Sequence, residues 1–127
     1  MKEEDFLTTR GKAVWFGQVR VPAEVTAGKE TPAFSYVVIE RMDDTGYIST
    51  CIPLLIDGYG KDKEYAVTDM VDNITYFLRK SFQGDEDSAW LNLYELSKSN
   101  PRSDALWDVY HALLYESARR GDKIILY

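Results

Sequence analysis

The chain has 127 residues, of which 45% are hydrophobic and 28% are charged, so composition predicts one ordinary globular domain spanning residues 1–127. One cysteine excludes an internal disulfide bridge, and a formal net charge of −6 disfavours direct nucleic-acid binding, which normally needs a Lys- and Arg-rich surface. The sequence shows neither a secretory signal pattern nor an apolar run near 18 residues, which predicts a cytoplasmic protein without membrane association.

The N-terminal half predicts a small antiparallel sheet. Its first ten residues are polar and acidic, so we expect a frayed end and a fold that starts after Arg10. A long loop over 22–33 is bracketed by two prolines, and the Asp- and Gly-containing run 42–46 predicts a tight hairpin. Residues 53–60 hold two glycines and predict at most a short bent strand. The strands themselves are predicted at 12–21, 34–41 and 47–52.

The C-terminal half predicts helices. Asp62 is suited to cap a helix over 63–81, because its carboxylate can accept from the first free N–H groups. Two further helices are predicted over 88–99 and 103–120, and the apolar end 122–127 predicts a terminal strand. The predicted fold class is therefore α+β, with an antiparallel sheet of three or more strands packed against the first helix. The expected core consists of Val14, Phe16, Val37, Ile39, Ile48, Val67, Met70, Val71, Ile74, Phe77 and Leu78.

No catalytic, cofactor or metal residue is predicted. The single histidine, His111, excludes two-histidine metal motifs, and a general-base role is weighed against an ordinary helix-surface position. Cys51 has no flanking cation and is expected to be a small buried residue rather than a nucleophile. The acidic runs 43–44 and 85–87 lack the spacing of a calcium loop and predict solvated turns. Gly58-Tyr59-Gly60 is too short to define a phosphate site.

Aromatic residues crowd the two C-terminal helices, where they predict core packing or a protein interface. An alternative function is open here: a small-molecule-binding protein or enzyme with a pocket between the sheet and these helices, using Tyr110, His111 and Tyr115. The aromatic set comprises Trp90, Tyr94, Trp107, Tyr110 and Tyr115.

The stretch from Tyr36 to Leu78 resembles the HicB-like antitoxin domain. It shares an apolar strand, an Asp/Gly turn before an aromatic residue, a Cys with a nearby Pro, a Gly before the helix cap, and fixed apolar positions in the helix. It differs from the family pattern in the position of Pro53 and in having Asp69 where the family's helix has Asn. The matching residues are Gly46, Tyr47, Cys51, Pro53, Gly60, Asp62, Ala66, Ile74, Phe77 and Leu78.

The resemblance implies a truncated ribonuclease H-like fold without metal-binding carboxylates, with a HicB-like core at about 12–82 and a helical C-terminal extension at about 86–127. It also implies a non-enzymatic interaction protein, namely an antitoxin that neutralises a small basic HicA-like RNA-cleaving toxin, or an orphan domain of that family. The acidic charge of the chain suits a basic partner. In place of the family's usual DNA-binding tail, we expect two Trp- and Tyr-rich helices and a strand, within an extension at about 86–127 whose net charge is acidic.

Self-association is expected as well, most simply as a homodimer. Ile124, Ile125 and Leu126 form an apolar run whose strand edge would pair either with the chain's own sheet or with the sheet of a second copy.

Overall fold

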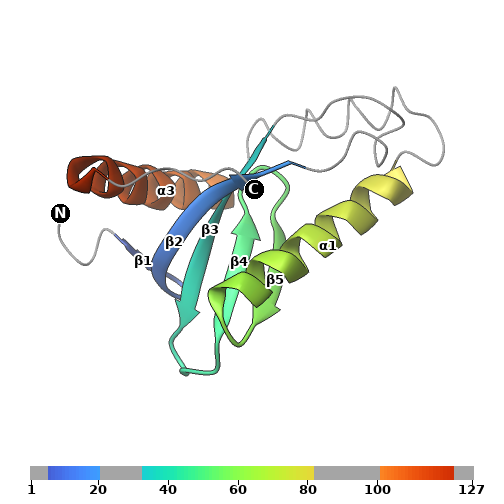
Figure 1. The fold of residues 1–127 in the computed structure, drawn as a ribbon, viewed down its shortest axis with the longest axis horizontal. Helices are drawn as coiled ribbons and strands as arrows, with labels where there is room; N and C mark the ends of the chain where they lie inside the picture. Colours follow the sequence, from blue (N-terminus) through green and yellow to red (C-terminus); the bar gives the residue numbers. More distant parts are fainter. Residues whose placement is uncertain (1–5, 21–32, 82–100, 122–127) are drawn as a thin grey trace.

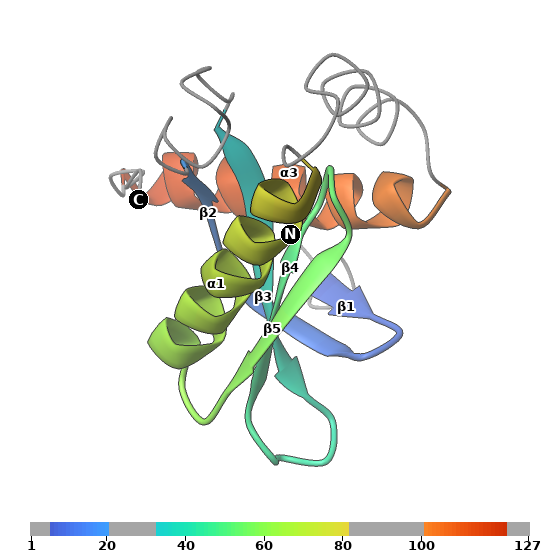
Figure 2. The same ribbon diagram turned by 90° about the vertical axis from the view of Figure 1, so that its right-hand side faces the viewer.

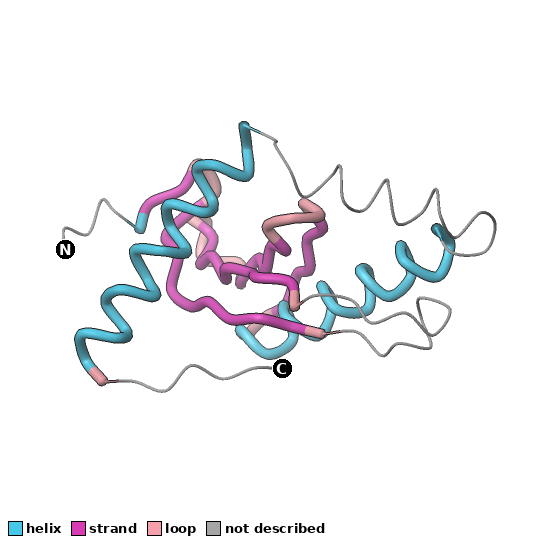
Figure 3. The backbone as a smooth tube through the Cα atoms, turned by 90° about the horizontal axis from the view of Figure 1, so that it is seen from above, coloured by secondary structure: helices cyan, strands magenta, loops and turns pink. Residues whose placement is uncertain are grey.

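The computed structural model describes residues 6–20, 33–81 and 101–121. Within these residues, five strands form one antiparallel sheet in the order β1-β2-β3-β4-β5. A helix lies on each side of this sheet (Figures 1 and 3). The predicted α+β class is confirmed. The elements are β1 (Leu7–Thr8), β2 (Gly11–Val19), β3 (Phe34–Arg41), β4 (Tyr47–Cys51), β5 (Ile56–Gly60), α1 (Lys63–Ser81) and α3 (Pro101–Arg120).

The central strand β3 is buried on both faces. Its six residues from Phe34 to Ile39 are all buried, and alternate side chains point to opposite sides of a strand. Phe34, Tyr36 and Val38 join one hydrophobic cluster, whereas Val37 and Ile39 join another. A sheet with a strand of this kind needs a covering layer on each face.

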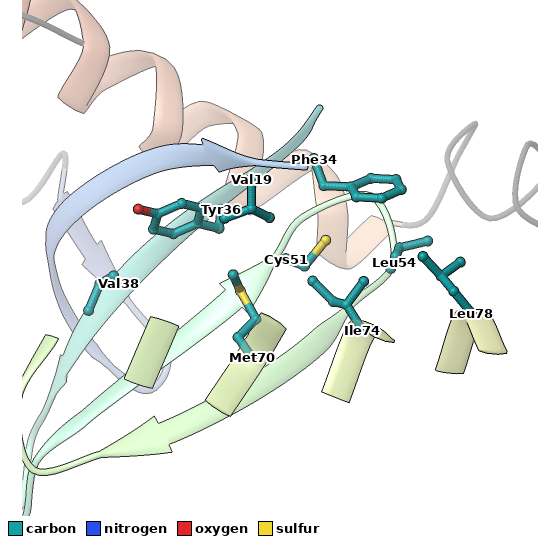
Figure 4. Close-up of a cluster of buried hydrophobic side chains, with 9 residues drawn as sticks. All are labelled: Val19, Phe34, Tyr36, Val38, Cys51, Leu54, Met70, Ile74 and Leu78. Carbon is teal, nitrogen blue, oxygen red and sulfur yellow. The ribbon is translucent and has the colours of Figure 1, made fainter. Parts of the chain in front are cut away.

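Helix α1 covers the face of the sheet over β3, β4 and β5 (Figure 2). Its residues Met70, Ile74 and Leu78 recur every fourth position, face the sheet and are fully buried. Figure 4 shows these three side chains against residues of β2, β3 and the end of β4. Asp62 caps the helix as predicted, because one carboxylate oxygen accepts from the Tyr65 N–H at 2.9 Å.

Helix α3 covers the other face, over β1, β2 and β3. Leu106, Val109 and Tyr110 pack on Phe16 and Ile39 in the second cluster. The helix starts two residues earlier than predicted, at Pro101, since proline is well tolerated in the first turn. Gly121 follows the helix with a φ of 76°, as the predicted stop signal requires.

The sheet differs from the sequence prediction at its two ends. The fold does not start after Arg10, because Leu7 and Thr8 already pair with Lys12 and Gly11 of β2. Residues 56–60 form a strand paired with β4 along its whole length, after a turn in which Leu55 has a φ of 54°. The predicted strands at 34–41 and 47–52, the hairpin between them and the helix over 63–81 are confirmed.

The predicted core is partly wrong. Val14, Val67, Val71 and Phe77 are only half-buried and lie at the margin of the first cluster. A bulge between Ala13 and Trp15 shifts the register of β2 by one residue, so that Ala13 takes the buried place expected for Val14. The predicted helix at 88–99 and the strand at 122–127 lie outside the described residues.

Gly58 allows α1 to lie directly on β5. A Cβ atom at this position would collide with the backbone of Ala66 and Met70. We therefore expect Gly58→Ala to lower the free energy of unfolding by about 3 kcal/mol, the upper end of the usual cost of overpacking. Urea unfolding followed by circular dichroism measures this change.

Asn73→Ala is the matched control for the same contact, because Asn73 is exposed on α1 and meets β5 through one hydrogen bond at 2.8 Å. It should cost only about 1 kcal/mol. Equal losses in the two variants would contradict the close packing of helix on strand.

Candidate interaction surface

The HicB-like pattern residues form the turn, cap and core of one unit built from β3, β4, β5 and α1. Gly46, with a φ of 131°, ends the β3–β4 turn, and Asp62 caps α1. The buried face of α1 includes Ala66, and the remaining apolar pattern residues of α1 lie on or beside that face. Pro53 is half-buried in the turn between β4 and β5. These pattern residues therefore have structural positions in the described fold, and they do not line a common hollow.

Cys51 is a buried member of the first cluster, as expected from its sequence context. Burial raises the pKa of its thiol from 9.0 to about 12, because an apolar surrounding disfavours the thiolate. A thiol in this state is a poor nucleophile at neutral pH. Its position at the end of β4, under α1, makes it a packing residue.

Modification of Cys51 tests this burial. At pH 8 a shift in pKa from 9.0 to about 12 lowers the thiolate fraction about a thousandfold. We expect a thiol reagent to modify the folded protein at least about a thousandfold more slowly than the protein unfolded in urea. The free energy of unfolding should also fall as the pH rises from about 9 towards 12, since only the unfolded chain then releases the proton. Rapid labelling of the folded protein would contradict this interpretation.

Residues 43–44 lie in a turn, as predicted, and the carboxylate of Asp43 bonds to residues beside it in the chain. One oxygen of Asp43 accepts from the Thr45 hydroxyl at 2.6 Å and the other pairs with Arg41 at 3.2 Å. The Thr45 hydroxyl holds the pKa of Asp43 below its ordinary value, with a smaller effect from Arg41. In the described ranges no three His, Cys, Asp or Glu residues come together as metal ligands would. The run 85–87 lies outside those ranges.

Arg10 forms a polar network that the sequence did not predict. Its guanidinium donates to Asp57 at 2.8 Å and to the Thr50 hydroxyl at 2.6 Å, and that hydroxyl donates to Asp57 at 2.7 Å. The network ties the β1–β2 turn to β4 and β5. Because each group has a partner, we assign this network to folding rather than to ligand binding.

A hollow lies on the α3 side of the sheet, and its lining differs from the residues expected for a pocket between the sheet and the C-terminal helices. This hollow of about 430 Å³ lies between α3 and the β1–β2 turn, lined by residues such as Arg10, Ala105 and Leu106. The lining includes neither Tyr110 nor His111 nor Tyr115. Tyr110 packs against Phe16, and His111 stacks on Trp107 with ring centroids 5.8 Å apart. Tyr115 is exposed to solvent. The residues predicted for this alternative therefore do not line this hollow.

The outer side of α1 carries two exposed tyrosines, one exposed carboxylate and one half-buried carboxylate. Tyr65, Asp69, Asp72 and Tyr76 follow each other at intervals of four, three and four residues, which places them along one side of a helix. Tyr65 and Tyr76 are 68% and 63% exposed, a large aromatic area to leave in water. Lys80 lies 5.1 Å from the Tyr76 ring centre and orients that ring. We call these four residues the α1 stripe.

The α1 stripe has the composition of a protein-binding surface. Tyrosine is enriched among the residues that contribute most to binding, and carboxylates beside it favour a basic partner. The apolar period, on which the helix prediction rests, does not include the residues of the stripe. The sequence of the same helix nevertheless contains a pattern that could have predicted the stripe, because its Tyr and Asp residues recur at helical spacing on the side opposite the apolar residues.

Ile124, Ile125 and Leu126, the predicted self-association residues, lie outside the described residues, as do Trp90 and Tyr94. No helix in the described ranges combines the length and apolar character that crossing a bilayer requires. Comparison with known proteins gave no match to any family model, curated protein or solved structure.

Proposed function

We propose that this chain is a non-enzymatic interaction protein of the HicB-like antitoxin kind, which binds and neutralises a small basic HicA-like toxin. The observation that carries the proposal is the α1 stripe, because it sets two exposed tyrosines and two carboxylates on the helix of the HicB-like segment. A basic partner would place a cation against the exposed carboxylate of Asp72 and cover the tyrosine rings, while Asp69 keeps its bond to the Tyr59 N–H.

Charge supports this choice of partner. The whole chain carries 21 acidic and 15 basic residues, so its field attracts a basic protein over distances longer than direct contact. The polar groups in the interior and turns of the described part serve folding instead. Cys51 is buried, Asp43 bonds its own turn, and Asp57 holds Arg10.

Co-expression with the product of a short basic reading frame beside this gene tests the proposal. We expect the two proteins to purify as a complex and this chain to relieve the growth arrest caused by the other. Tyr76→Ala and Asp72→Lys should each weaken the complex at least about tenfold, since Tyr76 is a candidate anchor and Asp72 lies one turn before it. Titration calorimetry measures the dissociation constant.

Asp108→Lys is the matched control, because Asp108 is exposed on α3 and its replacement changes the net charge equally. It should weaken the complex less than Asp72→Lys. The absence of a basic neighbouring gene, or a neighbour that neither binds nor is neutralised, would contradict the antitoxin proposal. Equal effects of the two lysine variants would contradict only the assignment of the surface.

A second candidate function is small-molecule binding, favoured by the hollow of about 430 Å³ beside α3. Its size falls within the range of small-ligand sites. A thermal-shift screen should then find compounds that raise the melting temperature of the wild type and of His111→Ala, which lies outside the hollow. Ala105→Phe narrows the hollow and should abolish the response. A screen without a responding compound, or an unchanged response in Ala105→Phe, would count against this function.

A further inference from the structure

The two edges of the sheet differ in whether their outward main-chain groups have hydrogen-bond partners. On β5, Asp57 and Tyr59 alternate with the residues that bond to β4, so their main-chain groups point outward. Helix α1 satisfies these groups: Asp69 accepts from the Tyr59 N–H at 2.9 Å, and Asn73 donates to the Asp57 carbonyl at 2.8 Å. The β5 edge is thus closed to a further strand at these positions.

The opposite edge is open within the described residues. Strand β1 pairs only with Gly11 and Lys12, and from Trp15 to Val19 strand β2 has no described neighbour on its outer side. The Ile52 N–H donates to the Ser35 carbonyl, so the main-chain groups of Ser35 point towards β4 and away from β2. Gln18 lies opposite Ser35 on β2, and in an antiparallel ladder its own main-chain N–H and C=O must therefore point away from β3, towards the outer side of the sheet. The same alternation directs the main-chain groups of Phe16 outward. An edge with free N–H and C=O groups is a template for another strand.

We propose that β2 pairs antiparallel with β2 of a second copy of this chain, centred on Gly17, so that one sheet runs through a homodimer. This register sets Phe16 of each copy opposite Gln18 of the other, and both pairs are hydrogen-bonded through their outward groups. It also sets Trp15, which is 38% exposed, opposite Val19 on the α1 side of the sheet.

The strand is self-complementary in charge. The cation Lys12 lies near the start of β2 and the cation Arg20 directly follows its last residue. Antiparallel pairing about Gly17 therefore places Arg20 opposite Val14 rather than opposite another cation. A parallel pair in register would align like charges. The charges therefore favour antiparallel over parallel pairing with a second copy. The proposed dimer does not depend on the antitoxin proposal.

Gln18→Pro tests the interface, with Gln18→Thr as its matched control. Both variants remove the 3.4 Å side-chain bond from Gln18 to Ser35, but only proline removes an outward N–H, and it leaves the bonds to β3 in place. Light scattering on the protein alone should give about twice 14.6 kDa for the wild type and for Gln18→Thr. The dimer dissociation constant should rise at least about a hundredfold in Gln18→Pro. A monomeric wild type, or an unchanged dimer in folded Gln18→Pro, would overturn the proposal.

Hydrogen exchange on the wild type keeps the proposal testable if the proline variant does not fold. The amides of Phe16 and Gln18 should be protected at high protein concentration and should exchange at least about tenfold faster on dilution. Protection that is independent of concentration and disappears on deletion of 122–127 would mean that the terminal segment occupies the edge, and this too would overturn the dimer. A failure of either kind leaves the binding of a basic partner by the α1 stripe unaffected.

Discussion

The burial of β3 on both faces is the constraint on which the rest of the structure depends. Six consecutive residues, Phe34 to Ile39, are withdrawn from water, which is favourable only if each face of the sheet has its own apolar cover. Helix α1 provides one cover and α3 the other, from opposite sides. The two clusters therefore share a strand, and losing either helix would expose alternate residues of that strand.

Helix α1 connects this constraint to the surfaces of the protein. Its buried side lies so close to β5 that Gly58 has no room for a side chain, and this closeness lets Asp69 and Asn73 reach the edge of the strand. With that edge capped, the outer side of the helix is left to present Tyr65 and Tyr76 to solvent. One helix thus closes the core, caps an edge and presents the proposed binding surface.

Several titratable and nucleophilic groups of the described residues have structural partners that explain their positions. Arg10 and Asp57 connect a turn to the far strand, Asp43 stabilises a hairpin turn, and Cys51 fills space beneath α1. A function based on surface recognition needs no other arrangement of these groups. It depends instead on rigid placement of exposed side chains, which a helix packed on a sheet supplies.

The sequence by itself determined the elements whose signals are local: β3, the turn to β4, the α1 cap at Asp62 and the apolar period of α1, all of which depend on neighbours within a few residues. The tertiary structure decided what depends on long-range contact. The bond from Arg10 to Asp57, 47 positions away, and the pairing of Leu7 and Thr8 with β2 bring residues 7–10 of the expected frayed end into the fold. The bulge beside Val14 changed which residues of β2 are buried. The capping of β5 by α1 left β2 as the open edge among the described strands. Such outcomes depend on register and packing between distant segments, and a local pattern carries no information about either.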